Sequence, residues 1–314
     1  MNSQWVISYP KKHLKANYAQ HHAHRTVIRN YLQDGLARMT NKTQSSFPSA
    51  AISAIESNLA RFIALADNWP AARTRIDPEI VWAISPVPFY TLNNIIAANL
   101  PEASLENSIE SVVALGQTQQ VPLIWWIGPS TKPATLRERL EQHGFMHAAT
   151  TPGMALDLLK MVDDPAPAIE HFKITKVDNT DALQILNQVS AQGIDLPEYA
   201  AKATFDMLRS ISSAPQSPLH HYVGWLNDTP VASTSMLLDL TIAGIYNVVT
   251  LPEARKRGIG SAMTRYALKD ARLQGAQMGI LHSSPHGVHV YQGLGFETFC
   301  QFELFLWGSQ FIQS

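Results

Sequence analysis

The chain has 314 residues, of which 46% are hydrophobic and 16% charged, and this length predicts about two domains. Its 24 basic and 25 acidic residues give a net charge of −1, which argues against a nucleic-acid partner, because such proteins carry a basic surface. Cys300 is the only cysteine, so an internal disulfide framework and a cysteine-based zinc site are excluded, and we expect no metal. Residues 1–10 lack the apolar core of a secretory signal, and the apolar stretch 121–127 is too short to cross a bilayer. We therefore expect a cytoplasmic protein with no membrane partner.

Residues 1–50 differ from the rest of the chain and form a basic N-terminal extension, which we expect to be partly disordered. Residues 26–39 have apolar side chains at helical spacing, whereas the polar stretch 40–49 is typical of a linker. His21, His22 and His24 cluster without acidic or cysteine partners. A metal site and an exposed arm both remain open for this cluster.

Helical and strand-like segments alternate from residue 51 to residue 162, which is typical of an α/β domain. Helices are predicted at 51–65, 104–115 and 136–143, and strands at 81–85, 122–128 and 152–159. The Pro-rich stretch 163–167 is interpreted as a linker, after which a second domain spans 168–314. In that domain we predict helices at 181–192, capped by Asn179 or Thr180, and 196–210, a hairpin of 221–226 and 230–238, and strands at 173–176, 241–250 and 278–283.

The loop after the strand 241–250 is the most informative segment of the chain. Three cations, Arg255, Lys256 and Arg257, precede Gly258 and Gly260, where a helix opens. Glycines allow the backbone to approach a ligand closely, and a helix start presents unpaired N–H groups and a positive dipole end. With the cations beside them, these groups predict an anion site suited to a pyrophosphate.

This loop and a second segment resemble the GCN5-related N-acetyltransferase (GNAT) superfamily. Arg255-x-x-Gly258-x-Gly260 after a strand end resembles the acyl-CoA loop of that superfamily, and Tyr291-x-x-Leu-Gly-Phe296, some thirty residues later, resembles its second signature. The resemblance covers residues 172–307 and implies an α/β fold, with a mixed, mostly antiparallel central sheet flanked by helices. The closing alternation of Phe302, Leu304 and Leu306 with Glu303 and Phe305 suits the last strands of the family.

The resemblance also implies the site and the cosubstrate, acetyl-CoA. Tyr291 stands where the family has its general acid, and Ser284 stands where an Asn often contacts the CoA arm. The backbone around 248–250 would hold the acetyl group and the pantetheine arm. The implied cofactor-binding residues are Val248, Val249, Thr250, Arg255, Lys256, Arg257, Gly258, Ile259, Gly260, Ser261 and Ser284.

The first domain is interpreted as a degenerate copy of the same fold. Leu140-Glu-Gln-His-Gly-Phe145 echoes Tyr291-Gln-Gly-Leu-Gly-Phe296, which indicates an internal repeat. Leu140 stands where Tyr291 stands, and residues 76–131 contain five acidic residues but no Lys or Arg. A pyrophosphate clamp cannot be built from that stretch, so we expect 51–162 to support or line the substrate site without being catalytic.

The expected reaction is direct attack by a primary amine, carried by a small molecule or a peptide, on the thioester of acetyl-CoA. The amine must lose a proton, yet the strand 241–250 contains no acidic residue and no histidine. The base stays open among Asp239, His220, His221, His282, His286 and a water chain ending on Tyr246. Trp125, Trp126 and Tyr90 are candidates for an apolar acceptor site, with a role in the core as the alternative.

Two other functions remain as alternatives. A catalytically inactive CoA-binding regulatory or scaffold protein is favoured by the missing strand acid and by Ser284, whereas Tyr291 argues against it. A nucleotide-binding domain would need G-x-G-x-x-G, but the loop reads Gly258-x-Gly260-x-x-Met263 and lacks the acidic residue expected at the ribose. The oligomeric state does not follow from the sequence.

Overall fold

The computed structural model of the protein describes residues 47–97, 99–162, 169–214 and 216–312. The predicted helix at 26–39 and the cluster of His21, His22 and His24 lie outside the described residues. The linker prediction for 40–49 is wrong at its end, because residues 47–49 already belong to a helix. The ring of Phe47 packs edge-on against Phe299 at 5.6 Å, and this contact fixes the first turn of that helix.

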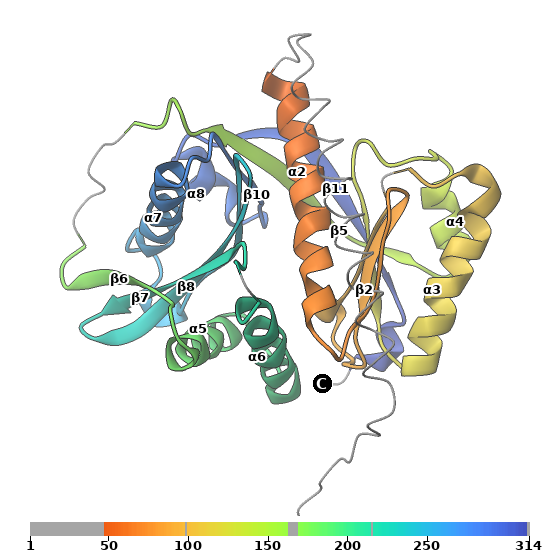
Figure 1. Cartoon of the computed structure of the whole chain (residues 1–314), viewed down its shortest axis with the longest axis horizontal. Helices are drawn as coiled ribbons and strands as arrows, with labels where there is room; N and C mark the ends of the chain where they lie inside the picture. Colours follow the sequence, from red (N-terminus) through yellow and green to blue (C-terminus); the bar gives the residue numbers. More distant parts are fainter. Residues whose placement is uncertain (1–46, 98, 163–168, 215, 313–314) are drawn as a thin grey trace, which may run out of the picture. The chain divides into compact units, whose positions relative to one another are not determined.

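The first part of the chain contains three helices and five strands in the described residues (Figure 1). They are α2 (Phe47–Ala64), β1 (Arg73–Ile76), β2 (Ile80–Ile84), β3 (Asn93–Ala97), α3 (Leu105–Gln119), β4 (Leu123–Ile127), α4 (Leu136–Gln142) and β5 (Met146–Asp157). The predicted helices and strands are confirmed within a few residues, except that β5 starts six residues earlier. The strands β1 and β3 were not predicted, because both are short and neither alternates clearly.

The second part repeats this alternation in the described residues and adds a longer antiparallel segment. Its elements are β6 (Phe172–Lys176), α5 (Thr180–Gly193), α6 (Glu198–Ser212), β7 (Leu219–Leu226), β8 (Thr229–Asp239), β9 (Ile242–Thr250), α7 (Ile259–Leu273), β10 (Met278–His282), α8 (Val288–Gln292) and β11 (Glu297–Trp307). Asn179 is the cap of α5, since its Oδ1 accepts a hydrogen bond from the Ala182 backbone N–H at 2.9 Å. The predicted hairpin is also confirmed: Asn227 and Asp228 both have positive φ, as a two-residue turn requires.

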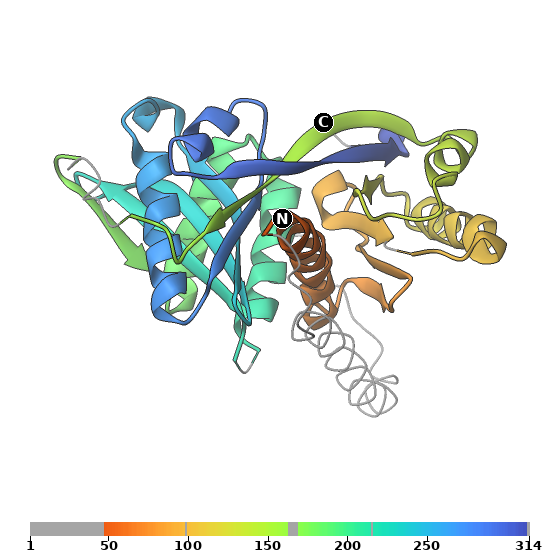
Figure 2. The ribbon, with the colours of Figure 1, turned by 90° about the horizontal axis from the view of Figure 1, so that it is seen from above.

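All eleven strands of the described residues form one sheet, in the order β1-β2-β3-β4-β11-β5-β10-β9-β8-β7-β6. The last strand of each part lies beside the other part. β5 pairs with β10 as far as His282↔Gly153, and β11 pairs with β4 from Glu303↔Ile127 onward. β5 and β11 also pair with each other, and Figure 2 shows the two long strands running together. The division of the sequence into 51–162 and 168–314 stays a prediction, but the strands of the two parts interleave.

Helices cover both faces of the sheet and separate the hydrophobic core into layers. The helix α7 packs on Met236 and Leu281, whereas α5 and α6 pack on Leu237, the neighbour of Met236. Because successive strand residues point to opposite faces, α7 lies on one face and α5 and α6 lie on the other. The helix α2 packs on Ile280, the neighbour of Leu281, and therefore lies on the face opposite α7 (Figure 1). No helix in the described ranges has the length and hydropathy to span a bilayer.

The internal repeat is visible in the helix ends that precede β5 and β11. After α4 the backbone N–H of Phe145 bonds to the Leu140 carbonyl at 3.0 Å, and after α8 that of Phe296 bonds to the Tyr291 carbonyl at 3.0 Å. Both turns contain a glycine with positive φ, and both phenylalanines are buried. The two segments that resemble each other in sequence therefore adopt the same local structure.

β11 keeps the alternation expected from its sequence, although its pairing with β5 is irregular. The register shifts between Leu304, which faces Ala149, and Phe305, which faces His147, so the extra residue belongs to β5. Phe302 and Leu304 pack in the same core as α2, whereas Phe305 and Trp307 are buried on the opposite face. The expected alternation of Phe302 and Leu304 with Phe305 is therefore present in β11.

Candidate acyl-CoA site

The two parallel strands β9 and β10 separate before they end. Their pairing runs from Met278↔Ile242 to Leu281↔Ile245 and goes no further. β9 continues to Thr250 against β8, through a register shift at which Asn247 has a φ of 51°. In the described part of the chain, residues 246–250 therefore have a strand partner on one edge only. Main-chain N–H and C=O groups on the other edge are available to an extended ligand.

The helix α7 begins where this strand leads, and its first turn is uncapped. Gly258 is the N-cap residue with a φ of 78°, and no side chain caps the helix. The first helical bond joins the Ala262 N–H to the Gly258 carbonyl at 3.0 Å. The preceding amides have no partner within the helix and lie at its positive dipole end, which favours an anion. A side chain at Gly258 would be strained by the positive φ, and Cβ at Gly260 would come no closer than 3.8 Å to the Thr250 hydroxyl.

The three cations of the loop differ in their contacts. The Arg255 guanidinium donates through Nε to the Thr250 carbonyl at 2.9 Å and through Nη2 to the Gly193 carbonyl at 3.0 Å. Arg255 thus ties the loop to the end of β9 and to the last residue of α5. Lys256 and Arg257 are exposed beside it. All three side chains are exposed, and the guanidinium of Arg255 is bonded to the main chain.

A buried carboxylate fixes α7 to the sheet. Asp270 accepts hydrogen bonds from the Tyr222 hydroxyl at 2.6 Å and from Lys176 Nζ at 2.5 Å. Burial alone raises the pKa of Asp270, but these two hydrogen bonds outweigh it and hold that pKa below its ordinary value. Burial, together with the bond to Asp270, raises the pKa of the Tyr222 hydroxyl. The C-terminal part of α7 is thereby fixed to β7 and β6.

Tyr291 and Ser284 are brought together around Gly287. Cβ at Gly287 would lie 3.0 Å from the Tyr291 ring, 3.0 Å from the Ser283 hydroxyl and 3.4 Å from the Ser284 hydroxyl. Tyr291 lies on α8, half-buried, with its ring 6.0 Å from that of Phe296. Burial raises the pKa of the Tyr291 hydroxyl to about 12. The phenol is therefore protonated throughout the neutral range.

The remaining predicted site residues lie along the strand end and the helix start. Val248 packs on the same hydrophobic core as Tyr291, whereas Val249 is buried on the other face, close to Gly193. Ile259 is buried under the first turn of α7, while Gly260 and Ser261 are partly exposed. The sequence did not point to Gly193 and Ser283. Gly193 is remote in the chain and carries no side-chain signal, whereas Ser283 could have been noticed beside Ser284.

The counterpart of this site in the first part of the chain is closed. β3 and β4 pair from Asn94↔Ile124 to Ile96↔Trp126, and beyond them the Leu100 N–H bonds to the Lys132 carbonyl at 3.0 Å. This bond joins the segment after β3 to the segment after β4, at the level where β9 and β10 stand apart. The internal repeat thus contains one open and one closed pair of strands.

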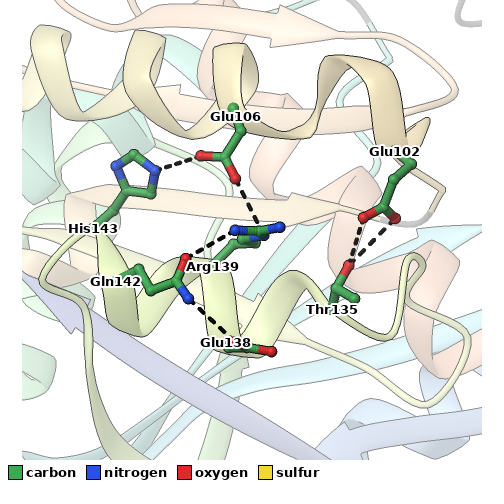
Figure 3. A network of polar contacts seen from close by, with 7 residues as sticks. All are labelled: Glu102, Glu106, Thr135, Glu138, Arg139, Gln142 and His143. Carbon is green, nitrogen blue, oxygen red and sulfur yellow. Dashed lines mark hydrogen bonds and ion pairs between the residues drawn. The ribbon is translucent and has the colours of Figure 1, made fainter.

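The start of α3 is also acidic, where α7 has its cationic loop. Figure 3 shows Glu106 in the first turn of α3 between Arg139 of α4 and His143, the residue after α4, at 3.2 Å and 2.7 Å. Glu102, just before α3, accepts a hydrogen bond from the Thr135 hydroxyl at 3.1 Å. Carboxylates at these positions repel a pyrophosphate. This acidic helix start supports the interpretation of the first part as a degenerate copy.

The candidates for a general base have very different surroundings. His221 is buried, with Nδ1 2.8 Å from the Ser235 hydroxyl and Nε2 3.4 Å from that of Ser212. The Tyr246 hydroxyl donates to Asn58 Oδ1 at 2.8 Å. The other candidates are Asp239 and His220, which are half-buried, His286, which is exposed, and His282, whose ring nitrogens are buried. Burial raises the pKa of Asp239 and lowers that of His220. Among the described residues no cluster of His, Cys, Asp or Glu is arranged to hold a metal.

The three aromatic candidates for an acceptor site also differ in their exposure to solvent. Trp125 is fully buried, with its ring 5.8 Å from that of Phe145, and belongs to the core of the first part. Trp126 points to the other face and is half-buried, with Nε1 donating to Asn94 Oδ1 at 3.0 Å. Tyr90 is 39% exposed. Trp126 and Tyr90 are therefore the two that a ligand can reach.

Comparison with known proteins agrees with this geometry. Residues 189–296, from α5 to the turn after α8, match the model of the acetyltransferase (GNAT) family. No curated protein matches the chain. The protein is similar to a GCN5-related N-acetyltransferase from Kribbella flavida, at 16% identity and a TM-score of 0.61, over 80% of this chain and 94% of that one.

Two further solved structures have the same architecture. One is a GCN5-related N-acetyltransferase from Sphaerobacter thermophilus, at 16% identity and a TM-score of 0.51, over 83% of this chain and 93% of that one. The other is a tandem GNAT protein from the clavulanic acid biosynthesis pathway, at 12% identity and a TM-score of 0.52, over 80% and 94% of the two chains. At these identities the likeness shows the fold. Residues 189–296 therefore match a domain of the acetyltransferase (GNAT) family, within a mixed α/β fold like that of the tandem GNAT protein.

Proposed function

We propose that the protein is an N-acetyltransferase that moves an acetyl group from acetyl-CoA to a primary amine by direct attack. The observation that supports this most strongly is the separation of β9 from β10 after Ile245, directly before the uncapped start of α7. The strand edge suits an extended amide-containing arm, and the helix start suits a diphosphate. The strand edge precedes the helix start along the chain, in the same order as the acyl arm and the phosphates of an acyl-CoA.

The cosubstrate would be held mainly by the backbone. The amides at residues 258–261 would bind the pyrophosphate, with Lys256 and Arg257 adding charge-assisted hydrogen bonds. The pantetheine arm would lie along 246–250, and the N–H groups around 248–250 would polarise the thioester carbonyl. Hydrogen bonds of this kind to a developing oxyanion are typically worth a few kcal/mol.

Tyr291 would act as the general acid. The neutral amine attacks the thioester carbonyl, a C–N bond forms and the C–S bond breaks. Tyr291 gives its proton to the departing CoA thiolate and later regains one from solvent, while the excess proton of the attacking nitrogen leaves to a base or to water. Burial raises the pKa of Tyr291 to about 12, which keeps the phenol protonated at neutral pH but makes it a weaker proton donor than a free phenol.

Thermal unfolding with millimolar acetyl-CoA, and with NAD as the control, tests cosubstrate binding. A ligand at about 100 times its Kd stabilises the folded state by roughly 2.7 kcal/mol, which raises Tm by several degrees. We expect the rise with acetyl-CoA alone. Thiol release from acetyl-CoA in the presence of amines then measures turnover.

The substitution Tyr291→Phe tests the acid. We expect kcat to fall by about a hundredfold or more while acetyl-CoA binding is unchanged. The matched control is Tyr266→Phe on α7, where the ring packs edge-on against Tyr222 and turnover should not change. An unchanged kcat in Tyr291→Phe contradicts the assignment of the acid. Binding of acetyl-CoA without turnover of any amine would instead favour a CoA-binding regulatory or scaffold protein.

A further inference from the structure

His282 ends β10 beside the place where β9 departs. The residue before it, Leu281, makes the last pair with β9, and His282 itself pairs only with Gly153 of β5. Ile280, two residues earlier on the same face, packs under α2. The His282 side chain therefore lies on the α2 face of the sheet, at the edge of the proposed acyl-CoA site.

The imidazole of His282 is surrounded by aromatic rings. The Phe302 ring lies 4.6 Å away at 79°, and the Trp126 ring lies 5.6 Å away at 67°. Both ring nitrogens are buried, and neither has a hydrogen-bond partner among the described residues. Burial lowers the pKa of His282 to about 4, so the ring is neutral at pH 7 and one nitrogen keeps a free lone pair.

His221 shows what a structural histidine looks like in this protein. It is buried as well, and its pKa is also lowered to about 4, but its two nitrogens face the hydroxyls of Ser235 and Ser212. A buried polar group without a partner destabilises the folded state, whereas a phenylalanine would fill the site of His282 without that cost. The unused nitrogens of His282 are therefore open to a partner that the described chain does not supply.

A second unused polar group lies on the same face. Asn58 of α2 sits over Gly244 of β9, whose neighbour on β10 is Ile280. Its Oδ1 accepts the hydrogen bond from Tyr246, but its Nδ2 is buried without a partner in the described chain. The face of the sheet beside the opening thus offers a free lone pair on His282 and a free donor on Asn58.

We infer that His282 accepts a hydrogen bond from the amino group of the acceptor, and that this amine is carried on an apolar carbon skeleton packed against Trp126. The inference rests on the proposed function and names the acceptor side of the same site. A primary amine in its reactive, neutral form has N–H donors for the imidazole lone pair. The half-buried Trp126 ring beside His282 suits an arylalkyl or alkyl amine better than a polar one.

The test compares the wild-type protein with His282→Phe and His282→Asn. The matched control is His147→Phe. The His147 ring packs on Phe305 at 5.6 Å, much as the His282 ring packs on Phe302, but His147 itself is exposed. Thiol release is measured with 2-phenylethylamine and with ethanolamine. Acetyl-CoA binding is measured by calorimetry and stability by urea unfolding without ligand.

We expect the wild-type protein to prefer 2-phenylethylamine. His282→Phe should lower kcat/KM for this amine at least tenfold, with an unchanged Kd for acetyl-CoA and an undiminished free energy of unfolding. His282→Asn, which keeps an acceptor oxygen, should retain more of the activity. His147→Phe should match the wild type in all three measurements.

Other outcomes overturn the inference and are distinct from a failure of the proposed function. If kcat/KM of His282→Phe stays within twofold of the wild type, or if this variant has a lower free energy of unfolding, then His282 serves packing alone. Equal use of ethanolamine, or binding of acetyl-CoA with turnover of neither amine, overturns the apolar acceptor. Absence of acetyl-CoA binding by the wild type would instead refute the proposed function itself.

Discussion

Replacing Arg255 by Ala should weaken the fold itself as well as the binding of acetyl-CoA. The guanidinium bonds to the carbonyls of Thr250 and Gly193 at 2.9 and 3.0 Å, which join the loop to β9 and α5. A hydrogen bond from a charged donor is worth about 1.5–3 kcal/mol in the best cases. Because Arg255 is exposed, solvent weakens both bonds, and we expect a total loss of about 1–2 kcal/mol. In a chain of this size that corresponds to a fall in Tm of about 2–5 °C.

Urea unfolding of the ligand-free protein is the assay, and Arg257→Ala is the matched control. Arg257 is exposed in the same loop, so its loss should leave stability unchanged and weaken acetyl-CoA binding about tenfold. Arg255→Lys should be intermediate in stability, because a single ammonium group cannot reach both carbonyls with the geometry of the guanidinium. A ligand-free stability of Arg255→Ala within about 0.5 kcal/mol of the wild type, the usual spread for surface substitutions, would refute this reasoning.

Two further predictions concern stability. In the folded protein the pKa values of His221 and His282 are about 4, below the ordinary 6.5, so between these values the unfolded chain binds more protons. The free energy of unfolding should therefore be highest above pH 6.5 and fall towards pH 4, by at most about 3 kcal/mol for each histidine. Urea unfolding across this pH range would measure the fall. Stability that stays flat from pH 7 to pH 4.5 would contradict it. Gly244→Ala should destabilise the protein by about 1–3 kcal/mol, since the added Cβ would overlap Asn58 Oδ1. At Gly260 a Cβ has room, so Gly260→Ala should change the free energy of unfolding by less than about 0.5 kcal/mol. Equal unfolding free energies of the two variants would show that α2 moves to accommodate the Cβ at residue 244.

The conformation of the loop at residues 255–261 could be predicted because its signals are local in sequence. The glycines, the cations and the helix start follow one another within residues 255–261, and the structure places them as a continuous turn. The turn after Tyr291 is equally local, since Gly295 and Phe296 encode it. Patterns of this kind depend on a few neighbouring residues, so they can be recognised even when the overall sequence identity to known proteins is low.

The contacts that join distant segments could not be predicted. The bonds of Arg255 to Gly193, and the approach of His282 to Trp126, depend on strand order, which hydrophobic periodicity does not encode. The register shift of β5 opposite Leu304 and Phe305 could not be predicted either, because it depends on which strands pair. For the same reason Trp125 and Trp126, adjacent and alike in sequence, were considered together although one is core and the other is accessible.

The exchange of β5 and β11 makes the first part of the fold dependent on a strand that is synthesised much later than β4. As the chain emerges from the ribosome, β4 has no neighbour on one side until residues 297–307 have appeared. An unpaired strand edge invites association with other chains, so this interval is the period of greatest exposure to aggregation. A truncation before residue 297 would therefore remove a neighbour of β4 as well as of β5, and would damage the first part of the fold together with the second.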